Sequence, residues 1–123
     1  MPSTRPSRVW IAERRVILVH PDGHRVAGHI AVGQPYTLAG ADPAVNYESH
    51  CPIEIDGLHS SRHPVISGGT LGALLSAVEF LGTMLHDFIA NGGRVLEPED
   101  ESDVPLALLF GPLFRAFDAR EAH

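Results

Sequence analysis

The sequence contains no lysine, a single cysteine and no uninterrupted apolar run of the roughly 18 residues that a membrane-spanning helix requires. One cysteine excludes an internal disulfide framework and a four-cysteine zinc site. Residues 1–8 are polar and lack the apolar segment of a secretory signal peptide. We therefore expect a cytoplasmic protein without a membrane partner.

The familiar signatures of catalysis are missing as well. The sequence has no phosphate-binding loop, no nucleophile elbow and no Cys-x-x-Cys or His-Glu-x-x-His motif. No cofactor is expected, and a binding protein is favoured over an enzyme. The 123 residues fit one domain, and 44% hydrophobic residues are enough to build a core.

Negative charge is concentrated near the end of the chain. Nine arginines and fifteen acidic residues give a formal net charge of −6. Residues 1–94 hold seven arginines and eight acids, a net −1, whereas residues 95–123 hold two arginines and seven acids, a net −5. Nucleic-acid binding depends on basic side chains that neutralise phosphates, so this balance disfavours a nucleic-acid partner.

A β-hairpin is the strongest local pattern in the sequence. The run VWIAERRVILVH (residues 9–20) is rich in β-branched and aromatic residues, and a second strand is expected over residues 25–32. The Pro-Asp-Gly sequence between them is typical of a tight turn. Two registers fit: a two-residue loop pairs Pro21 with His24, and a three-residue loop pairs His20 with His24.

A half-buried strand is expected over residues 45–58, and a short strand near residues 64–67. The apolar positions of the first strand alternate with polar ones, which indicates one wet face. These apolar positions are Cys51, Ile53 and Ile55. Because Pro52 has no N–H to donate, the strand must lie at an edge or turn Pro52 away from its neighbour.

The apolar period then changes to that of an amphipathic helix over residues 69–93. Thr70 or Ser67 is expected to cap its start, and the Asn-Gly-Gly sequence at residues 91–93 to end it. The predicted buried stripe consists of Leu71, Leu74, Leu75, Val78, Leu81, Leu85, Phe88 and Ile89.

Three segments follow the long helix. Residues 94–96 form a short apolar segment, and residues 97–103 (EPEDESD) form an acidic loop. Residues 104–120 have apolar residues at helical spacing, and Gly111-Pro112 should kink or interrupt that helical segment.

Together these patterns predict a flexible tail at residues 1–8 and a single α+β domain over residues 9–123. The domain consists of an antiparallel sheet of four or more short strands, one long helix that covers it, and a C-terminal helical segment.

Few residues are candidates for chemistry. Cys51 is the one thiol, but its neighbour His50 points to the opposite strand face, so a buried core cysteine is expected. Glu54 and Asp56 share a strand face roughly 7 Å apart, a spacing suited to acid and base or to a cation, although a solvated face explains them equally.

The sequence has eight histidines, and most are expected to be incidental surface residues. His59 and His63 have the spacing of a metal pair, but both would face one ion only on a helix, and a loop is expected there. They are the candidate metal ligands of this chain.

The acidic loop beside an apolar segment is the feature most suggestive of a partner. Residues 104–117 either fold back on the sheet as a second core helix or present apolar side chains beside the acids. An acidic surface suits a partner with a cationic cleft, because charge complementarity speeds association. The candidate partner-binding residues are Glu97, Glu99, Asp100, Glu101, Asp103, Phe110 and Phe114.

Three motifs resemble a family of short bacterial proteins that carry a domain of unknown function. They are IAERRVILVHPDG (residues 11–23), CPIEIDGL (residues 51–58) and GGTLGALLSAVEFLGTMLH (residues 68–86). The resemblance covers roughly residues 10–90 and implies the same order of hairpin, strand and long helix. It implies no catalytic residues, and the acidic loop and the apolar segment after it depart from the family pattern.

The favoured function is therefore that of a non-catalytic bacterial binding protein, such as an immunity protein that neutralises a cationic toxin domain through its acidic surface. One alternative is a homo-oligomer, in the simplest case a homodimer, that packs through the C-terminal apolar segment. Another is a small metal-binding protein or enzyme that uses His59, His63, Glu54 or Asp56.

Overall fold

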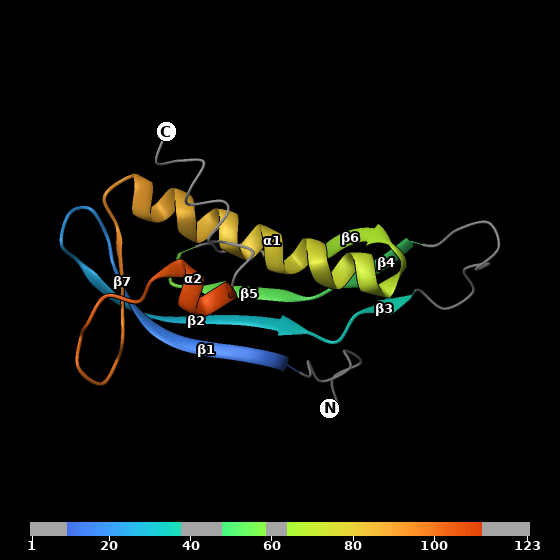
Figure 1. Ribbon diagram of the computed structural model, residues 1–123, viewed down its shortest axis with the longest axis horizontal. Coiled ribbons are helices and arrows are strands. Elements are labelled where there is room, and N and C mark those ends of the chain that lie inside the picture. The colour runs from blue at the N-terminus through green and yellow to red at the C-terminus, as the bar shows by residue number, and fades with distance from the viewer. Residues whose placement is uncertain (1–9, 38–47, 59–63, 112–123) are drawn as a thin grey trace, which may run out of the picture.

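The computed structural model describes residues 10–37, 48–58 and 64–111 of the chain. In this part the predicted α+β class is confirmed (Figure 1). The elements are β1 (Trp10–Val19), β2 (Arg25–Gly33), β3 (Tyr36–Thr37), β4 (Glu48–Cys51), β5 (Ile53–Asp56), β6 (Val65–Gly68), α1 (Gly69–Ala90), β7 (Arg94–Leu96) and α2 (Leu106–Phe110). The predicted tail (residues 1–8), His59, His63 and Phe114 lie outside the described residues.

The strands form two antiparallel sheets. Sheet A has the order β5-β2-β1-β7 and sheet B the order β3-β4-β6. Figure 1 shows α1 running along both sheets, with sheet B beside its N-terminal half. Pro52 separates β4 from β5, and its carbonyl accepts a hydrogen bond of 2.8 Å from the Gly33 N–H. The proline thus marks where the chain passes from one sheet to the edge of the other.

The β1–β2 hairpin has the three-residue loop. The His20 N–H donates to the His24 carbonyl at 2.8 Å, and Gly23 has a φ of +92° that favours glycine. Side chains alternate across the sheet, so this register decides which of them face α1. Val16 and Leu18 belong to the buried core beneath α1, whereas Glu13, Arg15 and His29 lie on the opposite, open face of sheet A.

The side of α1 that faces the sheets differs in part from the predicted stripe. Its buried residues are Ala73, Ala77, Leu81, Gly82, Leu85 and Phe88. Leu71 and Leu75 were predicted to be buried but are 70% and 55% exposed, and Ile89 is 38% exposed. The helix contacts both β4 and β6, and next to β6 a Cβ added at Gly72 would lie 3.2 Å from the Ser67 hydroxyl. Such close packing favours alanine at the contact rather than leucine.

The two ends of α1 test the capping predictions. Gly68 occupies the N-cap with no side-chain cap, so the prediction of Thr70 or Ser67 as a cap was wrong. At the other end the Gly92 N–H donates to the Ile89 carbonyl and the Gly93 N–H to the Phe88 carbonyl. This pair of bonds, with a φ of +98° at Gly92, is a Schellman motif and confirms the predicted stop.

By length and composition alone, α1 is also apolar enough to cross a membrane, and it is the one such helix among the described residues. A core helix meets the same criterion. Here Ala73, Ala77 and Leu85 are fully buried in the same core cluster as strand residues from both sheets. The helix is therefore the element that joins the two sheets.

Candidate partner-binding surface

Residues 97–103, predicted as a solvated loop, form an ordered turn, which we call the acidic turn. The Glu97 N–H donates to the Ser102 carbonyl at 2.8 Å, and the Glu101 N–H donates to the Glu97 carbonyl at 2.9 Å. Asp103 forms a β-bridge with Leu96, the last residue of β7. These bonds fold the turn back beside the strand that precedes it.

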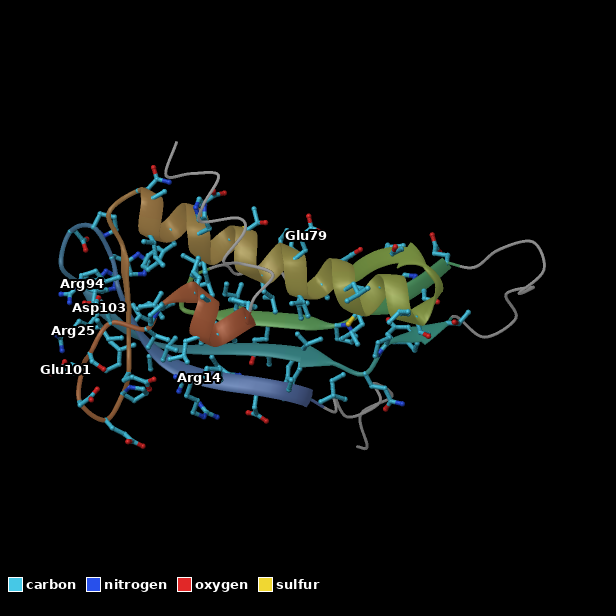
Figure 2. All side chains as sticks on the ribbon, in the orientation of Figure 1. Arg14, Arg25, Glu79, Arg94, Glu101 and Asp103 are labelled. Carbon is cyan, nitrogen blue, oxygen red and sulfur yellow. The ribbon has the colours of Figure 1, made fainter. Side chains whose placement is uncertain are left out.

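Arginines from three strands hold the acidic turn in place. Arg14 on β1 forms two hydrogen bonds with the Glu97 carboxylate, and Arg25 on β2 forms an ion pair with Glu101. Figure 2 shows Arg25 and Glu101 at the hairpin end of the molecule, near Arg94 and Asp103. These hydrogen bonds and ion pairs connect the turn to both strands of the hairpin.

Arg94 on β7 makes the third pair. Its Nε donates to Asp103 Oδ1 at 3.1 Å and its Nη2 to Oδ2 at 3.0 Å. This two-point contact fixes orientation as well as distance. The hydrogen bonds from Arg94 lower the pKa of Asp103, and hydrogen bonds from Ser102 lower the pKa of Asp100. Both carboxylates are therefore ionised at neutral pH.

The five predicted acids thus have unequal roles. In the described part of the chain, ion pairs with arginine engage Glu97, Glu101 and Asp103. Glu99 and Asp100 lie in the turn and are exposed. Five carboxylates against three arginines leave a negative balance on this surface, smaller than the sequence suggests.

An apolar groove of about 380 Å³ lies next to the acidic turn. One side is formed by the C-terminal end of α1, including His86 and Ile89, and the other by residues 103–106. Arg94 and Asp103, which form the ion pair described above, also line it. The groove therefore combines an apolar lining with charged residues that reach solvent.

Of the helical segment predicted over residues 104–120, the described part contains the short helix α2, and residues 112–120 lie outside the described residues. Leu106 is buried and anchors α2, whereas Leu108 is 69% exposed. Gly111, at a φ of +77°, ends the turn and confirms the predicted interruption. Phe110 is half-buried and lines a second cavity of about 230 Å³ beside Val78.

A separate cluster lies on the open face of sheet A. His29 is 8% exposed, which contradicts the prediction of an incidental surface histidine. Its Nε2 lies 2.8 Å from the Glu13 carboxylate, and its Nδ1 is hydrogen-bonded to Glu54. Burial disfavours the charged imidazole, but the hydrogen bonds with Glu13 and Glu54 outweigh that effect and raise the pKa of His29.

The two carboxylates predicted to act together on β5 have different surroundings. Glu54 is hydrogen-bonded to His29, whereas Asp56 is exposed to solvent. No group of three metal-binding side chains that could hold an ion occurs within residues 10–37, 48–58 and 64–111. The candidate pair His59 and His63 lies outside these ranges.

The predicted buried state of Cys51 is confirmed. The residue is fully buried, its thiol donates to the Gly33 carbonyl with Sγ 3.4 Å from the oxygen, and burial raises its pKa. We expect iodoacetamide at pH 8 to alkylate Cys51 at least ~100-fold more slowly in the folded protein than in urea, because the reactive thiolate forms only on opening. Mass spectrometry of quenched samples measures both rates, and equal rates would contradict the buried position.

Comparison with protein-family models, curated proteins and solved structures finds no match for this chain. The functional argument therefore depends on the geometry of the surface itself.

Proposed function

We propose that this chain is a non-catalytic protein-binding domain. Its binding surface, which we call the C-terminal surface, consists of the apolar groove, Leu108 on α2 and the acidic turn. The observation that carries the proposal is an apolar groove lined in part by an exposed ion pair, with a large exposed leucine nearby in the chain. Protein interfaces commonly combine an apolar centre with a polar, solvent-accessible rim.

The chemistry of this surface defines the partner that we propose. An apolar side chain would enter the groove, and flanking Arg or Lys residues would lie against Glu99 and Asp100. The negative balance that remains on the acidic turn, where five carboxylates lie against three arginines, favours association with such a cationic protein. An immunity protein that neutralises a cationic toxin domain in the bacterial cytoplasm is the specific form of this proposal.

Self-association is a second candidate, favoured by a different observation. Ile66, Leu71 and Leu75 are 54%, 70% and 55% exposed, and they lie on β6 and the N-terminal half of α1. Apolar side chains in such positions are suited to contact with a second copy of the chain. Analytical ultracentrifugation of the wild type and Leu75→Ser decides this candidate: a dimer that Leu75→Ser dissociates supports it, and a monomeric wild type refutes it.

Affinity purification from native cells tests the proposed surface. The test variants are Leu108→Ser and the double variant Glu99→Gln/Asp100→Asn. Each has a control on α1, outside both candidate surfaces: Phe80→Ser for the apolar change, at a residue that is 39% exposed, and Glu79→Gln for the charge. Figure 2 shows Glu79 on α1, well away from Arg94 and Asp103.

We expect one stoichiometric partner that the wild type and both controls retain and that each test variant binds at least ~10-fold more weakly. Titration calorimetry with the purified partner gives the affinities, and circular dichroism confirms that each variant is folded. Equal binding by test and control variants would place the interface elsewhere, and the lack of any stoichiometric partner would refute the binding role.

A further inference from the structure

His29 links three strands on the sheet face that does not carry α1. It lies on β2, and its two ring nitrogens contact Glu13 of β1 and Glu54 of β5. The side chain of His29 is 11% exposed and that of Glu54 19% exposed, so both groups are shielded from water. The Trp10 ring packs edge-on against the imidazole, with 6.1 Å between ring centroids.

This arrangement requires a proton on each ring nitrogen. An ionised carboxylate only accepts hydrogen bonds, so both contacts are hydrogen bonds only when the imidazole is an imidazolium. The neutral ring donates from one nitrogen and turns a lone pair toward the other carboxylate. Loss of the proton therefore replaces one hydrogen bond with repulsion.

Two more charged groups face His29 across the described strands. In the sheet register Arg15 of β1 lies opposite His29 on one side, and Asp56 of β5 lies opposite it on the other. The positive charge of Arg15 disfavours the imidazolium and lowers the pKa of His29, whereas the negative charge of Asp56 favours the imidazolium. The carboxylates from both neighbouring strands determine the balance.

β5 is the shortest of the three strands that this link connects. It is four residues long and lies at the edge of sheet A, where β2 is its one partner among the described strands. Pro52 precedes it, and Gly57, which has a φ of +91°, directly follows its last residue. Its attachment through backbone hydrogen bonds is therefore short, and the side-chain link between Glu54 and His29 adds to it.

We propose that His29, Glu13 and Glu54 form a proton-controlled clasp that holds the edge strand β5 to sheet A. With His29 protonated, the clasp is closed and β5 is protected. With His29 neutral, one of the two hydrogen bonds is replaced by repulsion, so β5 opens locally more often, although Ile53 and Ile55 still hold it to the core and the rest of the domain stays folded. The clasp lies on a different face from the C-terminal surface, so the two proposals fail independently.

The pH range follows from the direction of the shift. The pKa of His29 is raised in the folded protein, relative to an ordinary value near 6.5. Its contribution is thus complete below pH 6.5 and is lost as the pH rises through the folded-state pKa. Alkaline pH opens the clasp.

Amide hydrogen exchange of the full chain, followed by mass spectrometry between pH 5.5 and 8.5, tests this proposal. After correction for intrinsic exchange, we expect the protection of β5 peptides to fall about 5- to 10-fold across the titration, while α1 peptides keep theirs. His29→Gln and Glu54→Gln should remove the pH dependence, and His24→Gln, at an exposed histidine of the same hairpin, should retain it.

Two outcomes would overturn the clasp. One is a pH profile of β5 protection in the wild type that equals that of both Glu54→Gln and His29→Gln. The other is a parallel loss of protection in β5 and α1, which would make His29 a determinant of global stability. NMR titration of the ring gives an independent measurement: a midpoint above 6.5 that Glu54→Gln lowers supports the clasp, and a midpoint at or below 6.5 refutes it.

Discussion

Leu85→Ala is expected to lower the free energy of unfolding by about 2 to 5 kcal/mol, the range for a fully buried leucine that leaves a cavity. Leu85 has no exposed surface and belongs to the core cluster that α1 forms with strands of both sheets. Domains of this size are stable by only about 5 to 15 kcal/mol, so the substitution removes a large part of the total. Urea denaturation followed by circular dichroism measures the change.

Leu71→Ala is the matched control, with the same chemical change on the same helix. Leu71 is 70% exposed, so its removal is expected to cost less than about 0.5 kcal/mol. Both leucines belong to the stripe that apolar periodicity predicts. Equal losses from the two variants would show that the periodicity is right and that the orientation of α1 described above is wrong.

Local patterns predicted most of the elements. The hairpin, the alternation around Pro52 and the Asn-Gly-Gly helix stop depend on neighbouring residues, whose backbone preferences act within a few positions. The orientation of α1 does not depend on neighbouring residues in the same way. In the first half of the helix, the small residues Ala73 and Ala77 are fully buried, whereas the larger Leu71 and Leu75 are exposed. Apolar periodicity gives the larger leucines more weight and therefore shifts the predicted face.

The charged contacts could not be predicted from sequence for a different reason. Arg14 meets Glu97, 83 positions away, and His29 meets Glu54, 25 positions away. Such pairs are determined by strand order and register, and the hairpin sequence left two registers open. Strand alternation places Glu13 and Arg15 on the same face of their strand. It does not show that Glu13 contacts His29 on the neighbouring strand.

In the acidic turn, these long-range contacts change the surface that a partner would meet. A sequence of five carboxylates in seven residues predicts a free anionic surface. In the fold, three of these carboxylates secure the turn against β1, β2 and β7, so they help to shape the groove beside it. In the binding role that we propose, the contacts come from the apolar lining together with Glu99 and Asp100. A variant that neutralises all five acids at once would not distinguish a loss of binding contacts from a loss of the shape of the surface.

A second large effect on stability is expected from a substitution at Gly93, just after the end of α1. A Cβ at this position would lie 2.5 to 2.7 Å from three ring carbons of Phe88. Phe88 is 8% exposed, and its ring centroid is 5.3 Å from that of His20, so the ring has little room to move. We expect Gly93→Ala to destabilise the fold by about 1 to 3 kcal/mol, the usual cost of overpacking a core. Thermal and urea unfolding measure this cost.

Two further variants separate this steric effect from backbone strain. Gly92→Ala tests strain alone, since Gly92 has a φ of +98° and a Cβ there would lie no closer than 3.6 Å to Pro21; it should cost about 1 to 2 kcal/mol. Phe88→Leu shortens the clashing side chain. If the clash determines the cost, Gly93→Ala/Phe88→Leu is less destabilised than the sum of its single variants by at least ~0.5 kcal/mol. Strict additivity would show instead that contact with the Phe88 ring does not cause the destabilisation, because a clash between two side chains cannot persist once one of them has been shortened.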